Sequence, residues 1–161
     1  MNSDTGYKFV RLAIVSIVAM ILQIGFIPMI EIGAWRPDLI LLVVIFIGFR
    51  YGSTNGIIAG FILGALQDSF SPHPVGISAF ADTIVGFLSG QMRQLKLAYN
   101  TRSLAFILLI LIQTSLFFLI YQIQTDVSYL YLIATRVFPN TLYTFLIAIL
   151  LSVFLRDQLE Y

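Results

Sequence analysis

Two charged side chains stand inside otherwise apolar stretches and are the first candidates for chemistry. Asp82 lies about seven residues inside one such stretch, and Arg136 lies about as far inside another. An unpaired charge in an apolar medium costs on the order of several kcal/mol, so such charges normally find partners. We therefore predict an Asp82–Arg136 ion pair that fixes two helices, with Gln113 as a candidate third member. A proton or ion path and contact with a partner protein remain open as alternatives.

Asp68 is the more informative carboxylate because it falls at the end of a helix expected over residues 56–68. Negative charge is unfavourable at a helix C-terminus, so this carboxylate needs a compensating interaction. The free amide groups at the start of a neighbouring helix could provide it. We predict this structural role, with docking of an extracytoplasmic partner as the alternative and catalysis as the weakest reading.

No constellation of an enzyme or a metal site is recognisable. His73 is the only histidine and lies between two prolines, and the chain has no cysteine. Metal-ligand spacing is therefore missing, and no serine nucleophile stands in a recognisable elbow near Asp68 and His73. The glycine-rich run after Gly52 lacks the Gly-Lys-Ser/Thr ending of a phosphate-binding loop. We expect no catalytic residue, cofactor or metal.

Prolines and glycines mark further candidate structural or partner-binding positions. Pro37-Asp38 suits the first turn of a helix, where proline is tolerated and a carboxylate is favourable. Pro139-Asn140 interrupts an apolar helix and predicts a kink, with a binding notch as the alternative. Gly76 precedes another helix and His73 lies in the loop before it, and both belong to the same group of candidates, as does Asp68.

Composition places these residues in a membrane protein. The 161 residues are 59% hydrophobic and 11% charged, and the mean hydropathy is +0.94. A soluble domain carries about 25% charged residues. We expect an all-α fold forming one integral membrane domain over residues 1–161. At about 20 residues a span, its six transmembrane helices cover roughly residues 9–28, 37–51, 56–68, 75–92, 103–121 and 131–155.

The orientation follows from counting lysine and arginine. With six spans and a cytoplasmic N-terminus, Arg36 lies outside and Arg136 lies within the last helix. Seven of the nine basic residues then lie inside, which predicts that both termini are cytoplasmic. A re-entrant hairpin of the second and third helices is the alternative, and the count disfavours it. The inner residues are Lys8, Arg11, Arg50, Arg93, Lys96, Arg102 and Arg156.

Small residues at four-residue spacing predict where helices meet. This spacing places glycines on one ridge of a helix, so that a second backbone can approach closely. Lipid gives helices no hydrophobic reason to associate, so close packing must hold them together. We predict internal packing here, with an interface to another subunit as the alternative. The glycines are Gly52, Gly56, Gly60, Gly64, Gly86 and Gly90.

Several of these motifs together resemble the family of the rod shape-determining protein MreD. The resemblance extends over most of the chain, and the glycine-rich run ending in Gln67-Asp68 is its most specific part. Ser78 and Asp82 depart from the pattern. The matching segments are Pro37-Asp38-Leu39-Ile40-Leu41-Leu42, Arg50-Tyr51-Gly52, the run from Gly56 to Asp68, Gly76-Ile77-Ser78-Ala79-Phe80 and Phe138-Pro139-Asn140-Thr141-Leu142-Tyr143.

This resemblance implies an inner-membrane subunit of the bacterial elongation machinery. Such a protein binds the bitopic coiled-coil protein MreC, and with it connects MreB filaments to the glycosyltransferase RodA and a class B penicillin-binding protein. The family's fold is similar to the substrate-binding subunits of energy-coupling-factor vitamin transporters, which supplies a second function.

The polar residues and the first helix separate these two functions. A scaffold needs few convergent polar groups, and the sequence indicates few. A vitamin-binding subunit needs several polar side chains around an outward cavity and a small-residue ridge on its first helix. Here Ala13 is followed four positions later by Ile17, and Ser16 by Met20, so the ridge is absent. We therefore expect a non-catalytic scaffold.

Overall fold

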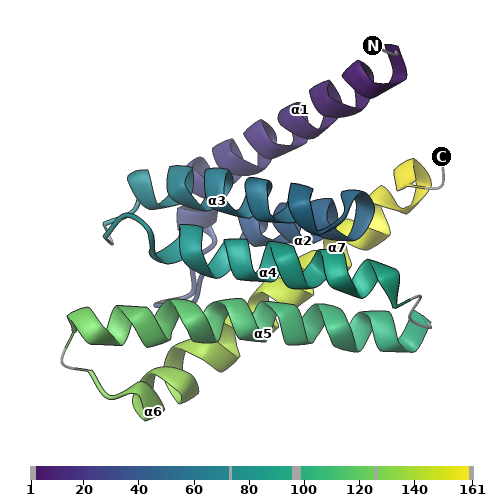
Figure 1. Cartoon of the computed structure of the whole chain (residues 1–161). Helices are drawn as coiled ribbons and strands as arrows, with labels where there is room; N and C mark the ends of the chain where they lie inside the picture. Colours follow the sequence, from purple (N-terminus) through teal and green to yellow (C-terminus); the bar gives the residue numbers. More distant parts are fainter. Residues whose placement is uncertain (1–2, 73, 96–98, 126, 160–161) are drawn as a thin grey trace.

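The computed structural model describes residues 3–72, 74–95, 99–125 and 127–159, and all of their regular elements are helices. These helices pack side by side in one bundle (Figure 1). The elements are α1 (Ser3–Gly25), the 3-10 helix η1 (Ile27–Met29), α2 (Leu39–Tyr51), α3 (Ser53–Ser69), α4 (Ile77–Gln94), α5 (Tyr99–Gln124), α6 (Tyr129–Leu132), the π-helix η2 (Ile133–Val137) and α7 (Phe138–Leu159).

Helices form at all six places that the sequence indicated, with ends that differ by a few residues. The last expected helix, residues 131–155, is instead a continuous series of α6, η2 and α7. The loop before α2 is closed by an isolated bridge between Ile32 and Trp35. In the described part of the chain, three helical stretches are long and apolar enough to cross a membrane: Val10–Met29, Ser103–Ile123 and Tyr129–Leu151. α2 is apolar but shorter.

The shortest apolar helix, α2, lies at the centre of the bundle. One cluster of buried side chains joins it to α1 and α3, through residues such as Ala19, Val44 and Leu63. A second cluster joins its other face to α4 and α5. Because most of α2 is buried by protein, its frayed backbone groups are covered by neighbouring helices. α1, in contrast, exposes most of its apolar side chains, as expected of a helix that faces lipid.

The helix connections alternate between two ends of the bundle (Figure 1). The start of α1, the α2–α3 junction, the end of α4 and the end of α7 lie at one end. The loops that follow α1, α3 and α5 lie at the other. The junction between α2 and α3 is a single residue, Gly52, whose φ of +93° favours glycine.

Candidate functional site

Three glycines of α3 lie directly against the backbone of α4. A Cβ atom added to Gly60 would lie 2.8 Å from the backbone nitrogen of Thr83 and would overlap the carbonyl group of Asp82. One added to Gly64 would lie 2.7 Å from the Cα of Ala79. Gly56 and Gly86 meet in the same way, each against the backbone of the other. These positions have no room for a side chain, so the ridge is internal to the chain.

Two further glycines extend this contact to α2 and its junction with α3. Gly90 lies against Gly52 and Ser53, and an added Cβ would be 2.6 Å from the carbonyl carbon of Gly52. Gly48 was missed, although it continues the four-residue spacing backwards. A Cβ there would be 2.8 Å from the Gly86 carbonyl oxygen. We name the contact of α3 and α2 with α4 through Gly48, Gly56, Gly60, Gly64, Gly86 and Gly90 the glycine seam.

Gly52 has a different role from the one predicted. A Cβ on it would meet only the Nη1 atom of Arg93, at 3.6 Å, which is ordinary contact. Its positive φ shows that it is needed for the tight α2–α3 junction. The four-residue spacing therefore includes Gly52, although this glycine is required for the turn between α2 and α3 and not for close packing against another helix.

Asp68 closes the end of the glycine seam by binding the first turn of α4. Its carboxylate accepts hydrogen bonds from the backbone amides of Gly76 at 2.7 Å, Ser78 at 3.0 Å and Ala79 at 3.2 Å. The side chain is 1% exposed. A helix N-terminus offers free amides and partial positive charge, which compensate a buried carboxylate. Gly76, with a φ of +113°, sits at this N-terminus as its cap.

Asp82 is fully buried and binds a neutral partner. Its Oδ1 accepts a hydrogen bond from Nε2 of Gln113 in α5, at 2.9 Å, and its Oδ2 has no partner among the described residues. The predicted ion pair with Arg136 does not form, because Arg136 Nη1 instead donates to the backbone carbonyl of Ala34 at 2.9 Å. Equal distance from the helix ends along the sequence does not give equal depth in the bundle. Arg136 in fact reaches the loop at the end of the bundle.

The segment around Pro139 binds the loop that precedes α2. Because proline has no N–H, the chain passes through the π-turn of η2, where the amide of Phe138 donates to the Ile133 carbonyl. Asn140 Oδ1 then accepts the amide of Arg36 at 3.1 Å. Thr144 Oγ1 accepts the amide of Asp38, also at 3.1 Å. The helix irregularity and the polar side chains after it thus anchor the loop.

Asp38 caps the start of α2 as the sequence indicated, whereas Pro37 precedes the cap instead of lying in the first turn. Pro37 is buried, and its carbonyl accepts a hydrogen bond from Nε2 of Gln23 at 3.2 Å. Asp38 is the N-cap of α2, and its Oδ1 accepts the amide of Leu41 at 2.9 Å. Its Oδ2 accepts from Nε2 of Gln67, at 3.2 Å. Asp38 therefore ties the start of α2 to the end of α3.

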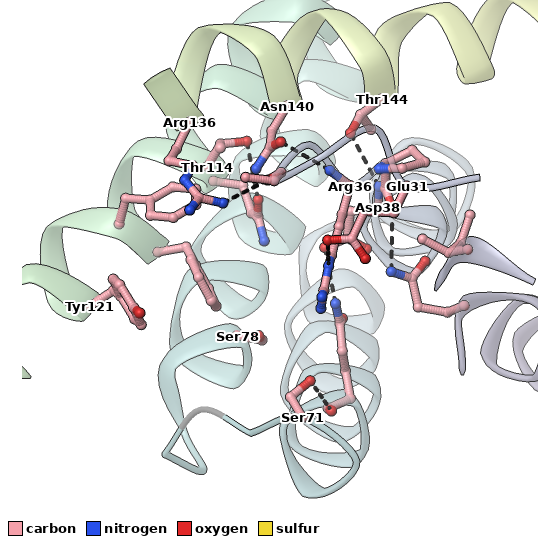
Figure 2. A pocket seen from close by; sticks show the side chains of 18 of the residues that line it. Glu31, Arg36, Asp38, Ser71, Ser78, Thr114, Tyr121, Arg136, Asn140 and Thr144 are labelled. Atoms are coloured by element: carbon pink, nitrogen blue, oxygen red, sulfur yellow. Dashed lines mark hydrogen bonds and ion pairs between the residues drawn. The ribbon is translucent and has the colours of Figure 1, made fainter. Parts of the chain in front are cut away.

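These polar groups surround a cavity of about 480 Å³ at the end of the bundle where α2, α4 and α7 begin (Figure 2). Its lining contradicts the expectation of few convergent polar groups. No local sequence pattern could reveal it, since the residues come from segments far apart in the chain. The polar and charged residues in its wall are Gln23, Glu31, Arg36, Asp38, Gln67, Ser71, Ser78, Gln113, Thr114, Tyr121, Tyr131, Arg136, Asn140 and Thr144.

His73 lies outside the described residues. Within the described ranges, no group of three or more His, Cys, Asp or Glu side chains could hold a metal ion. The arrangement of the described residues offers close helix packing, a capped helix and a polar cavity.

Comparison with known proteins places these features in one family. No curated protein and no solved structure matches the chain. A family model described as rod shape-determining protein MreD matches residues 3–161, which is nearly the whole sequence. The chain therefore belongs to the MreD family of rod shape-determining proteins.

Proposed function

We propose that this protein is a non-catalytic, multi-pass subunit of the bacterial inner membrane that serves the cell-wall elongation machinery. It binds MreC and, through it, helps to position or regulate RodA and a class B penicillin-binding protein relative to MreB filaments. Membership of a shape-determining family supports this role. The single observation that carries it is the glycine seam, because a scaffold must present a fixed surface to its partners.

The seam makes α2, α3 and α4 one rigid unit. Gly56 and Gly86 lie backbone to backbone, and so do Gly60 and Asp82. Interfaces of this kind use close van der Waals packing, which is the main source of helix association in lipid. Asp68 adds hydrogen bonds that fix α3 and α4 in register. A partner that binds the unit meets a shape that changes little on binding.

Six transmembrane segments with both termini in the cytoplasm belong to the same proposal. The alternation of connections between two ends of the bundle supports an even number of crossings (Figure 1). The excess of Lys and Arg on the side of the termini supports their cytoplasmic location. α2 then crosses within the protein interior, where a short helix is tolerated, and α3 and α4 each bury one face along the glycine seam and expose apolar side chains such as Phe61 and Phe87 on the other.

Co-purification with MreC tests the scaffold. A Gly60→Leu variant forces a side chain into the α4 backbone and should abolish recovery of MreC with the protein, and rod shape with it. Gly25→Leu is the matched control, because a Cβ at Gly25 meets nothing within 4 Å. It should retain both. Normal MreC recovery by a Gly60→Leu protein would contradict the proposal.

The cavity favours a second candidate, a substrate-binding subunit of a vitamin-type transporter. Its polar wall provides the convergent groups that such a subunit needs. The first helix, however, lacks the small-residue ridge through which those subunits meet their ATPase-linked partner. The two functions separate in one preparation from native membranes: retention of MreC supports the scaffold, and tight retention of a vitamin without MreC supports the transporter.

A further inference from the structure

Of the charged side chains in the cavity wall, Arg136 and Asp38 do not pair with each other. Arg136 comes from η2 and Asp38 from the start of α2 (Figure 2). Among the described residues, the ion pair at this end of the bundle joins Arg36 to Glu31 at 2.7 Å. Arg136 and Asp38 are thus left without an oppositely charged partner in the described part of the chain. In an apolar bundle, separated charges are costly unless the content of the cavity compensates them.

Arg136 is only partly used by the protein. Its Nη1 donates to the Ala34 carbonyl, and a guanidinium carries about five N–H donors in all. Asn140 uses its Oδ1 to accept the amide of Arg36, while its amide nitrogen has no partner among the described residues. A guanidinium and an amide N–H group on one wall form a donor set suited to a carboxylate or a phosphate.

Asp38 offers the opposite chemistry. Its two carboxylate oxygens each accept one hydrogen bond, whereas a carboxylate has about four acceptor positions. The side chain of Gln67 donates one of these bonds, and its own Oε1 is buried without a donor. This wall therefore has acceptors in excess. A group with a positive charge and several N–H donors, such as an ammonium, would match it.

The size and the remaining wall fit a small amphipathic molecule. A volume of about 480 Å³ lies within the range of about 300–1,000 Å³ that is usual for ligand pockets. Phe117, Phe118 and Leu132 provide apolar surface between the polar groups. We propose that the cavity binds a small zwitterionic group, with its acidic end at Arg136 and Asn140 and its ammonium end at Asp38.

Such a group has two sources. It occurs in free molecules such as O-phosphoethanolamine, and it is the headgroup of phosphatidylethanolamine in the membrane. Both carry an acidic phosphate and an ammonium a few bonds apart. Binding of this group does not depend on the MreC interaction, so either property can fail while the other holds.

The single tryptophan of the chain provides a reporter beside the cavity. Trp35 lies between Ala34 and Arg36, which both line the cavity, and its Nε1 donates to the Thr135 carbonyl at 3.1 Å. The experiment follows Trp35 fluorescence of the purified full chain. One arm adds O-phosphoethanolamine to delipidated protein in detergent. The other adds increasing dioleoyl-phosphatidylethanolamine to nanodiscs of phosphatidylglycerol. We expect a saturable change in at least one arm, and the responding arm identifies the source.

Charge variants show whether the binding uses the proposed groups. Asp38→Asn keeps a good helix cap but removes the charge, and Arg136→Gln removes the guanidinium. Each should raise the apparent Kd by at least about tenfold, which is the effect of losing one charge-assisted contact. Arg136→Lys keeps the charge and should lose less. Arg50→Gln, at the far end of α2, is the control and should bind as the unchanged protein does.

Three outcomes would overturn the proposal. A saturable response in neither arm would show that the cavity does not bind this zwitterionic group. Equal responses to ethanolamine or to inorganic phosphate alone would show recognition of one charge instead of two. Unchanged binding by Asp38→Asn and by Arg136→Gln would remove these side chains from the site. Thermal melting before each titration identifies variants that do not fold. If Arg136→Gln is one of them, unchanged binding by Asp38→Asn overturns the proposal.

Discussion

α3 and α4 meet through their backbones, whereas the loop before α2 is joined to η2 and α7 through side chains. At the glycine seam, an added methyl group at Gly56 or Gly60 would overlap the facing chain. At the other contact, Trp35 and Asn140 span the gap with hydrogen bonds of 3.1 Å. The first contact leaves no space and the second borders a cavity. The difference shows how one small bundle combines a rigid part with a part that has room for a ligand.

The two contacts also depend on different physics. Close packing in the seam relies on many weak contacts that a single methyl group can disrupt. The contact between loop and α7 relies on separate hydrogen bonds, each worth about 1 kcal/mol. Loss of one such bond leaves the others in place. Substitutions in the seam should therefore have larger effects than substitutions around the cavity.

The largest effect is expected in the seam. Gly86→Ala places a methyl group against the Gly56 backbone and should destabilise the protein by about 3 kcal/mol or more, because backbone cannot move aside cheaply. The thermal midpoint in detergent, followed by size-exclusion fluorescence, measures this. Gly25→Ala, in open space, should change stability by less than about 0.5 kcal/mol. Equal thermal midpoints for Gly86→Ala and Gly25→Ala would contradict the larger effect expected in the seam.

A substitution of Asp68 tests whether the seam also depends on the hydrogen bonds between this carboxylate and the first turn of α4. Asp68→Ala leaves the amides of Gly76, Ser78 and Ala79 without their acceptor and should cost about 3 kcal/mol. Ser69→Ala is the neighbouring control, since the exposed Ser69 hydroxyl donates only to the carbonyl of Ala65 in its own helix. The same thermal measurement applies. A small loss for Asp68→Ala would mean that water replaces the carboxylate and that glycine packing alone sets the register.

The smallest effect concerns the coupling of Asp82 with Arg136. Since each has another partner, the effects of Asp82→Asn and Arg136→Gln should add to within about 0.5 kcal/mol in the double variant. Asp82 and Gln113, which are hydrogen-bonded, should instead show a coupling of about 1 kcal/mol or more. Thermal melting of both double-variant cycles checks this. Strong coupling of Asp82 with Arg136 would restore the ion pair that the sequence suggested.

Local patterns were sufficient for the helices and for most of the seam. Apolar runs marked all six helical regions, because a helix in lipid must satisfy its own backbone and shield it with apolar side chains. Four-residue glycine spacing marked Gly56, Gly60 and Gly64, since spacing on a helix directly determines which residues share a face. The position of Asp68 at a helix end was enough to indicate that it needs free amides.

Such local patterns do not predict which side chains from distant segments contact one another across the bundle. An opposite charge in another helix predicts Arg136 as the partner of Asp82, but the depth of Arg136 depends on how the π-turn and the loop before α2 are arranged. The cavity was missed for the same reason. Its wall brings Gln23, Gln67 and Asn140 together from helices far apart in the chain.

The sequence by itself determined an all-helical, lipid-compatible chain, the ridge along which two of its helices touch, and the family signature. These properties depend on spacing along one segment or on composition. Only the tertiary structure decided that Gly52 turns the chain, that Gln113 binds Asp82, and that Arg136 and Asp38 face a common cavity. Such relations depend on the relative rotation and depth of separate helices, which packing of the whole bundle sets.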